Sequence, residues 1–197
     1  PEAAIESRHL GLKTAAEITD LQRKIALLAD AAQRSIDWAL LEKLCGRPAP
    51  AAIPQNFPAT RVRIAVARDP AFCFTYAETL EALRENGAEL CFFSPLQDTA
   101  LPPNIGGLYL PGGYPELYAA QLAANTAMRS AVKTAVESGL PTVAECGGFL
   151  YLGQTLEDAD GKTYPMAGVL PGQGVKIGHL VRFGYAALTS NADSMLF

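Results

Sequence analysis

Apolar residues between positions 18 and 44 recur every three or four residues, whereas later apolar residues gather in short runs. The first spacing puts one apolar stripe on a helix, so it predicts one long amphipathic helix over 18–44. Thr19 or Asp20 can cap its start, and Gly46 follows its last turn. The next segment, 46–60, holds four prolines and predicts an extended linker between two domains.

Beyond the linker, short apolar runs alternate with segments of helical periodicity. Strands are predicted at 61–67, 88–93, 106–110 and 140–145, and helices at 75–87, 115–123, 125–139 and 148–156. Near-continuous apolar strands separated by helices indicate an α/β fold, with a mostly parallel sheet and helices on both faces. From Tyr164 onward, short β runs between glycines and prolines predict an antiparallel extension.

Composition narrows the classes of function. The 197 residues are 49% hydrophobic and allow one sizeable core, and a net charge of -4 argues against nucleic-acid and membrane surfaces. No apolar run reaches the roughly 18 residues that a membrane span needs, and no secretory signal opens the chain. Four cysteines without a C-x-x-C pair and two histidines argue against zinc and a disulfide framework, and we expect a cytoplasmic protein.

Cys146 lies where a predicted strand turns into a predicted helix, in the stretch "PTVAECGGFLYLG" (141–153). A nucleophile on such a sharp turn needs small residues two positions before and after it, and here these are Ala144 and Gly148. Parallel sheets bind ligands beyond the carboxyl ends of their strands, which is where Cys146 stands. The following helix N-terminus stabilises negative charge on the sulfur. These features predict that Cys146 is a catalytic nucleophile.

A second glycine-rich turn, "LYLPGGYPE" (108–116), follows another predicted strand and should reach the same edge of the sheet. Its glycines let the backbone approach a ligand and turn an N–H inward. We therefore expect the N–H groups of Gly113 and Gly147 to form an oxyanion hole for a bound carbonyl group.

The other reactive side chains make weaker candidates. Three cysteines are interpreted as small core residues: Cys45, Cys73 and Cys91. His179 lies in a polar hairpin and His9 lies outside the α/β domain, so neither is favoured as a catalytic base. Asp69 either reaches the active edge or caps a turn, and the sequence leaves both alternatives open.

The runs "AVARDPAFCFTY", "FFSPL", "LYLPGGYPELYA" and "AECGGFLYLG" resemble the cobyrinic acid a,c-diamide synthase family, which includes hydrogenobyrinic acid a,c-diamide synthases. The resemblance is to that family's C-terminal glutamine amidotransferase domain. It implies a class I, flavodoxin-like amidotransferase domain over 61–197, preceded by a linker over 46–60. The run "ESRHLGL" resembles the end of the ATP-dependent synthetase domain, which the resemblance places at 1–45.

The resemblance also implies the chemistry. The Cys146 thiolate attacks the side-chain amide of glutamine, and ammonia travels to the synthetase domain. There ATP and Mg²⁺ activate the a and c carboxylates of a corrin in cobalamin biosynthesis, which makes the full-length enzyme a carbon–nitrogen ligase. The amidotransferase domain itself is expected to bind no cofactor and no metal. Glutamine and the corrin are the expected partners, with no nucleic acid and no membrane. A homodimer and the choice between cobyrinic and hydrogenobyrinic acid stay open.

One departure from the family concerns the catalytic histidine. In the family it lies in a "GHEFHYS"-like motif, which this chain, ending at Phe197, does not contain; neither His9 nor His179 matches that motif. Residues 1–197 alone are therefore expected to show negligible glutaminase turnover. Two alternatives remain: a cysteine-elbow hydrolase or isomerase on another substrate that uses an acid such as Glu145, and a non-catalytic binding module of the same fold.

Overall fold

The computed structural model describes residues 2–5, 7–8, 11–46, 61–177, 184–185 and 187. The chain divides into two units, Pro1–Phe57 and Pro58–Phe197, and each is described by itself. Within the described ranges, no helix is both long and apolar enough to cross a membrane. His9 and His179, the histidines considered as bases, lie outside the described residues.

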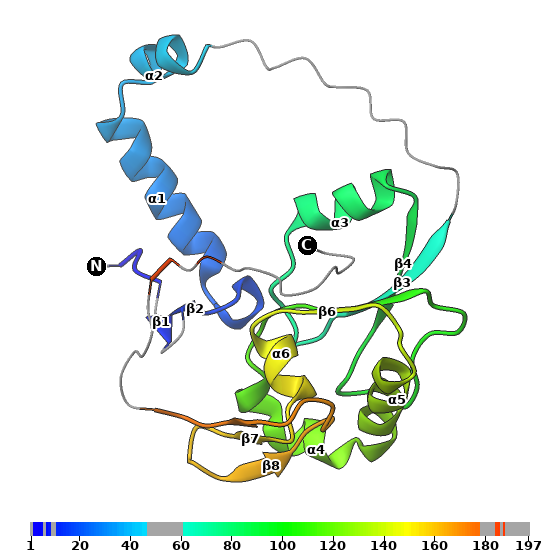
Figure 1. Ribbon diagram of the computed structural model, residues 1–197. Helices are drawn as coiled ribbons and strands as arrows, with labels where there is room; N and C mark the ends of the chain where they lie inside the picture. The colour runs from blue at the N-terminus through cyan, green and yellow to red at the C-terminus, as the bar shows by residue number, and fades with distance from the viewer. Residues whose placement is uncertain are drawn as a thin grey trace. The chain divides into compact units, whose positions relative to one another are not determined.

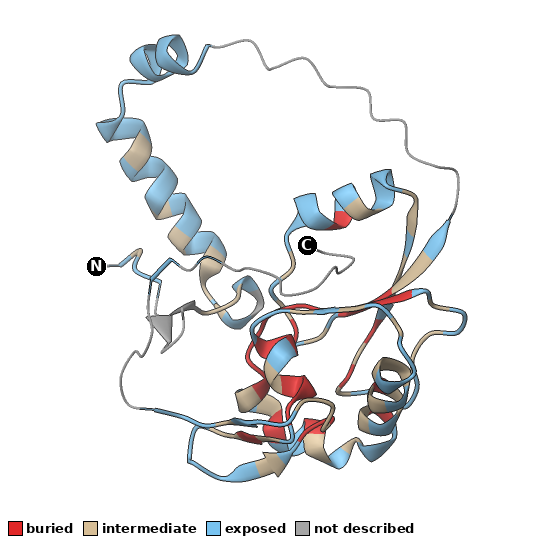
Figure 2. Cartoon of the chain, in the orientation of Figure 1, coloured by how far each residue is buried: buried red, intermediate tan, exposed pale blue. Residues whose placement is uncertain are grey.

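The first unit contains short paired strands and two helices. Its elements are β1 (Ser7–Arg8), β2 (Gly11–Leu12), η1 (Ala15–Glu17), α1 (Leu21–Ser35) and α2 (Trp38–Cys45), with β1 and β2 antiparallel. Neither α1 nor α2 contains a buried residue, so in Figure 2 α1 is pale blue and tan and α2 is pale blue. The boundary between the units lies inside the predicted linker, and the assignment of residues 1–45 to a synthetase domain stays a prediction.

The prediction of one continuous helix over 18–44 is wrong, because the chain breaks between α1 and α2. Ile36 has extended backbone angles (φ -104°, ψ 130°). Asp37 then caps α2, and its carboxylate accepts the Leu40 N–H at 3.0 Å. The apolar spacing continues through Ile36 and hides the break, whereas the aspartate offers the backbone a local alternative to the helix.

The second unit is an α/β domain, as the sequence predicts. Its elements are β3 (Val62–Ala67), α3 (Ala77–Glu85), β4 (Ala88–Phe93), β5 (Gly107–Leu110), η2 (Pro115–Tyr118), α4 (Ala119–Ala124), α5 (Thr126–Glu137), β6 (Thr142–Ala144), α6 (Gly147–Leu152), β7 (Thr155–Glu157), β8 (Thr163–Pro165) and β9 (Gln173–Gly174). Four strands form a parallel sheet in the order β4-β3-β5-β6. All four carboxyl ends therefore lie at one edge.

Helices cover both faces of the parallel sheet, with α3 on one side and α4, α5 and α6 on the other (Figure 1). Successive residues of β3 pack on opposite faces of the sheet. Ala65 and Ala67 belong to the larger core, and Val66 belongs to the smaller core with Leu80 of α3. Because successive strand residues point to opposite faces, a fully buried strand needs apolar residues at nearly every position.

A strand begins soon after Leu152, where the sequence predicts the end of a helix. The helix predicted over 148–156 ends at Leu152, because Gly153 takes an extended conformation (φ -64°, ψ 176°) and the chain continues into β7. In the small sheet β8-β7-β9, β7 is antiparallel to β8 but parallel to β9. The antiparallel extension is therefore correct for β8 and wrong for β9, and most of the tail beyond Ile177 lies outside the described residues.

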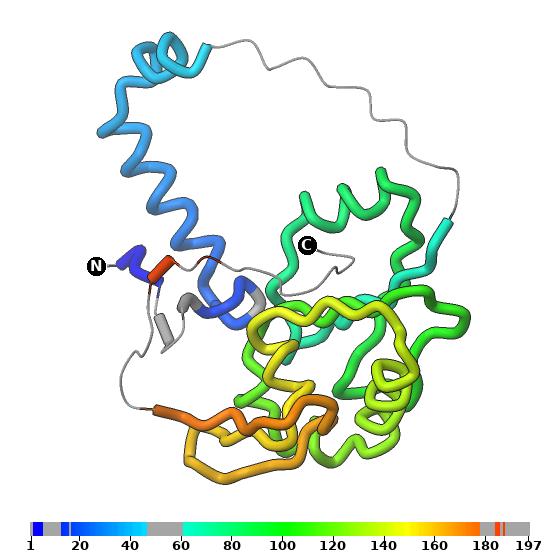
Figure 3. Tube along the Cα trace, in the orientation of Figure 1, coloured from blue at the N-terminus to red at the C-terminus, as the bar shows by residue number. Residues whose placement is uncertain are grey.

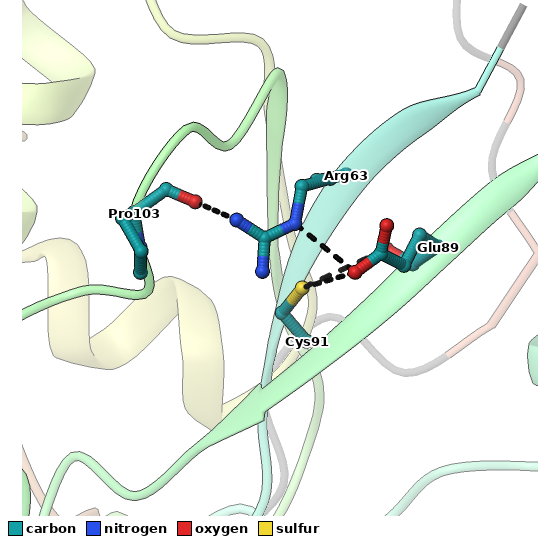
Figure 4. Close-up of polar contacts among 4 residues, drawn as sticks. All are labelled: Arg63, Glu89, Cys91 and Pro103. Carbon is teal, nitrogen blue, oxygen red and sulfur yellow. Dashed lines mark hydrogen bonds and ion pairs between the residues drawn. The ribbon is translucent and has the colours of Figure 1, made fainter.

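A polar contact joins β3 and β4 near the start of both strands (Figure 4). The Arg63 Nε atom lies 3.1 Å from Glu89 Oε1, and the guanidinium also donates to the Pro103 carbonyl. The Cys91 sulfur lies 3.9 Å from the same Glu89 oxygen. Since parallel strands share one direction, this contact lies at the opposite end of the sheet from the carboxyl edge.

Candidate active site

Cys146 occupies a sharp turn between β6 and α6, where the chain trace reverses (Figure 3). Its backbone angles are φ 47° and ψ -109°, a conformation that residues with a side chain rarely adopt. Such strain costs on the order of 1–3 kcal/mol and is found mostly at functional positions. The residue is exposed, so the sulfur stands outside the core. The strand–turn–helix arrangement expected for a nucleophile is present.

The turn packs tightly against the end of β5. The Leu110 carbonyl accepts the Glu145 N–H at 3.0 Å, and the Glu145 carbonyl accepts the Gly148 N–H at 2.8 Å. A Cβ atom on Gly148 would lie only 2.1 Å from the Leu110 oxygen. The small residue expected two positions after Cys146 is therefore a steric requirement.

The glycine-rich turn after β5 meets the cysteine turn. A Cβ atom on Gly112 would lie 3.4 Å from the Cβ of Cys146. A Cβ atom on Gly147 would lie 3.1 Å from the Gly113 nitrogen and 2.7 Å from the Pro115 ring. The structure thus brings together Cys146, Gly113 and Gly147, the residues that the sequence selects.

Gly113 and Gly147 are both buried residues. Within the part of the chain that the structure describes, neither N–H donates to another protein group. Buried backbone donors are nearly always paired, so two unpaired donors side by side deserve an explanation. A negatively charged ligand oxygen beside Cys146 would provide one.

Glu145, the acid of the alternative hypothesis, has a hydrogen-bond partner on β5. Its Oε2 atom accepts the Tyr109 hydroxyl at 2.9 Å, and Tyr109 belongs to the smaller core under α3. Burial and then this hydrogen bond raise the pKa of Tyr109 to about 12. The carboxylate therefore ties the cysteine turn to β5.

Asp69 caps a turn, which decides between the alternatives that the sequence leaves open. Its Oδ1 atom accepts the N–H groups of Ala71 (2.8 Å) and Phe72 (3.2 Å). Its Oδ2 atom accepts the Ser94 hydroxyl (2.9 Å) and the Leu96 N–H (3.0 Å). The sequence predicts only the contacts with Ala71 and Phe72, because an aspartate followed by a proline favours a local turn.

The remaining cysteines are not core residues, so that interpretation is wrong. Cys45 is exposed, and Cys73 and Cys91 are partly exposed. The general tendency of a lone cysteine to be a core residue fails for Cys45, because α2 buries no residue. Among the described residues, no group of three His, Cys, Asp or Glu side chains is placed to hold a metal ion.

Comparison with known proteins identifies the family. Residues 63–179 match the model of the CobB/CobQ-like glutamine amidotransferase domain. The chain belongs to this family. The match includes both turns that build the site of this amidotransferase domain, and it confirms the resemblance read from the sequence.

The similarity to curated relatives covers more of the chain than the family model does. The chain is 44% identical over 202 residues, 99% of its length, to a cobyrinate a,c-diamide synthase of Dehalococcoides mccartyi. It is 49% identical over 173 residues, 87% of its length, to a hydrogenobyrinate a,c-diamide synthase of Pseudomonas aeruginosa. A cobyrinate a,c-diamide synthase of Synechocystis sp. is 41% identical over 204 residues, 100% of the chain. The chain spans only 44%, 39% and 42% of these relatives, respectively.

Proposed function

We propose that Cys146 hydrolyses the side-chain amide of glutamine and releases ammonia for an amide-forming reaction. One observation supports this most strongly: an exposed cysteine on a strained turn lies beside the backbone of two buried glycines, Gly113 and Gly147. A thiol needs a nearby carbonyl carbon to attack, and the oxygen of that carbonyl needs donors when it becomes negative. The cysteine turn provides the thiol, and the backbone of the two glycines provides the donors, at one edge of the sheet.

The reaction proceeds through a covalent thioester. The Cys146 thiolate bonds to the amide carbon of glutamine, and the carbonyl electron pair moves to the oxygen, which binds the N–H groups of Gly113 and Gly147. Collapse of this intermediate breaks the carbon–nitrogen bond, and the nitrogen takes up a proton and leaves as ammonia. Water then attacks the thioester, giving glutamate and restoring the thiol. Glutamine and water are thereby converted into glutamate and ammonia.

The general base is not assigned to any described residue. Glu145 is bound to the Tyr109 hydroxyl, and Asp69 accepts four hydrogen bonds. The contacts of both carboxylates are therefore structural, and they disfavour the alternative in which Glu145 activates the thiol.

For the whole protein we propose the activity for which its relatives are named, the a,c-diamidation of a corrin in cobalamin biosynthesis. A carboxylate and ammonia do not condense spontaneously in neutral water, so ATP with Mg²⁺ would activate the carboxylate. The described residues hold no group suited to Mg²⁺, and we assign this step to none of them. We propose a reducing cytoplasm as its location, because the spacing of its four cysteines does not suggest a disulfide framework.

Labelling with a glutamine-analogue electrophile tests the proposal. Cys45 and Cys146 are both exposed, so Cys45 serves as an internal control for general thiol reactivity. We expect the analogue to modify Cys146 selectively, glutamine to protect it, and the Cys146→Ala protein to stay unlabelled. A simple alkylating agent should label both thiols, and glutamine should not protect Cys45 from it. Peptide mass mapping reads out each site.

The outcomes separate the competing functions. Selective labelling of Cys146 without protection by glutamine would favour a cysteine-elbow enzyme with another substrate. Equal labelling of Cys45 and Cys146 by the analogue would contradict a glutamine site and favour a binding module of the same fold.

A further inference from the structure

The loop after β3, residues 69–74, packs against the turn that carries Gly113; we call it the Asp69 loop. The Ala71 carbonyl accepts the Tyr114 N–H at 3.0 Å. The same carbonyl oxygen would lie 2.1 Å from a Cβ atom on Gly113, so the two backbones touch. The Asp69 loop therefore fixes the position of the Gly113 backbone from the side away from solvent, where Ala71 is fully buried.

The other end of the Asp69 loop fixes the direction of the Gly113 N–H. Phe74 forms an antiparallel bridge with Gly112, and its N–H donates to the Gly112 carbonyl at 3.0 Å. The Gly112 carbonyl and the Gly113 N–H belong to one planar trans peptide, in which they point in opposite directions. A carbonyl held toward Phe74 therefore turns the Gly113 N–H away from Phe74.

Asp69 is the side chain that holds this loop in place. Through Oδ1 it closes the turn at Ala71 and Phe72, and through Oδ2 it binds Ser94 and Leu96 in the loop after β4. A carboxylate that accepts four hydrogen bonds joins two loops that are 25 or more residues apart in the chain. Charge-assisted hydrogen bonds of this kind are about twice as strong as neutral ones.

We propose that Asp69 is a positioning residue, which aims the Gly113 N–H at the oxyanion through Ala71 and Phe74. This inference rests on the proposed glutaminase function. Preorganised donors stabilise a transition state only if they are held where the charge develops. Small displacements of a positioned group reduce rates strongly, so a loosened Asp69 loop lowers the rate of attack without affecting glutamine binding.

The Asp69→Asn substitution in the intact protein tests the proposal. The amide nitrogen donates and cannot accept, so two of the four donors lose their partner in either orientation of the amide. We expect kcat for glutamine hydrolysis to fall about 10- to 100-fold with KM nearly unchanged, a loss below the roughly 10²–10³-fold cost of removing an oxyanion donor entirely.

Alkylation of Cys146 by iodoacetamide distinguishes positioning from general damage. This displacement takes place at a tetrahedral carbon and forms no oxyanion, so it needs the thiol but not the Gly113 N–H. We expect Asp69→Asn to alkylate at the normal rate while its acylation by glutamine slows. Ser94→Ala removes one of the four donors to Asp69 and should give the same pattern with a smaller loss.

Asp158→Asn is the matched control. Asp158 also accepts two backbone N–H groups, from Asp160 and Lys162, but it lies in the turn between β7 and β8. It should leave kcat, KM and alkylation unchanged. An unchanged kcat in Asp69→Asn, or an equal loss of acylation and alkylation, would overturn the positioning role. A wild-type protein that glutamine does not acylate would instead refute the proposed function itself.

Discussion

Single residues around Cys146 were predictable where the local turn chemistry dictates them. A cysteine between a strand and a helix, with glycines after it, specifies a strained turn from a few adjacent letters, and the structure contains that turn. The role of Asp69 could not be foreseen in the same way, because half of its partners lie 25 and 27 residues further along the chain. Local sequence carries no information about such contacts until the sheet order is known.

Gly148→Ala tests the close packing of the cysteine turn. The new Cβ atom would stand 2.1 Å from the Leu110 carbonyl oxygen, so the backbone of α6 or β5 must shift. We expect a loss of about 1–3 kcal/mol in the free energy of unfolding, measured by urea denaturation. Gly172→Ala is the control, since nothing lies within 4 Å of its added Cβ, and it should change stability by less than about 0.5 kcal/mol. Equal stability of both variants would contradict the tight contact.

Tyr109 makes stability depend on pH in the alkaline range. Burial and the Glu145 hydrogen bond raise the pKa of Tyr109 from 10.0 to about 12. The unfolded chain therefore loses this proton first, so the stabilisation is complete below pH 10 and is lost as pH rises through 12. Tyr109→Phe should flatten the decline of the unfolding free energy across this window.

Urea unfolding at a series of alkaline pH values measures this effect. Part of the decline should remain in the variant, because burial also raises the pKa of Tyr151. Tyr185→Phe, which removes an exposed hydroxyl, is the control. An identical pH profile for wild type and Tyr109→Phe would refute the assignment.

At the scale of elements, the strands of the parallel sheet were the most predictable parts. Continuous apolar runs bounded by glycine or proline place β3, β4, β5 and β6 within a few residues of their observed bounds. The breaks were harder to predict, because Ile36 keeps the helical spacing while Asp37 starts a new helix. Likewise only two residues separate β7 from the end of α6, and its pairing with β8 and β9 defines β7 as a strand.

The start of α5 depends on Asn125, which connects the helix to the loop after β4. Its Oδ1 atom accepts the Met128 N–H at 3.2 Å, and its Nδ2 atom donates to the carbonyls of Pro95 and Asp98, each at 2.8 Å. Asn125→Ala should cost about 2–3 kcal/mol in unfolding free energy, because it removes a helix cap and two further hydrogen bonds.

Asn125→Asp separates these contributions. The carboxylate keeps the cap on Met128 but cannot donate to the two carbonyls, so thermal unfolding should place its stability between wild type and Asn125→Ala. An aspartate variant as unstable as the alanine variant would contradict this expectation and show that the retained cap does not outweigh the repulsion between the carboxylate and the two carbonyls.

At the scale of the whole molecule, the two units differ in how they bury apolar residues. The second unit has a core of its own on both faces of the sheet, whereas α1 and α2 bury no residue (Figure 2). The residues of the proposed glutamine site, Cys146, Gly113 and Gly147, lie in the second unit, which also contains the match to the amidotransferase family. The relatives are more than twice as long as the chain, so the use that we propose for the ammonia is a hypothesis about the complete protein.

The central claim is that the Cys146 sulfur bonds to the amide carbon of glutamine. Rapid acid quenching of the intact protein during turnover, followed by mass spectrometry of the Cys146 peptide, tests it most directly. We predict a γ-glutamyl thioester on that peptide, and neither an adduct nor ammonia release in the Cys146→Ala protein. Ammonia release that persists in Cys146→Ala, or turnover of wild type with no adduct on the Cys146 peptide, would contradict it.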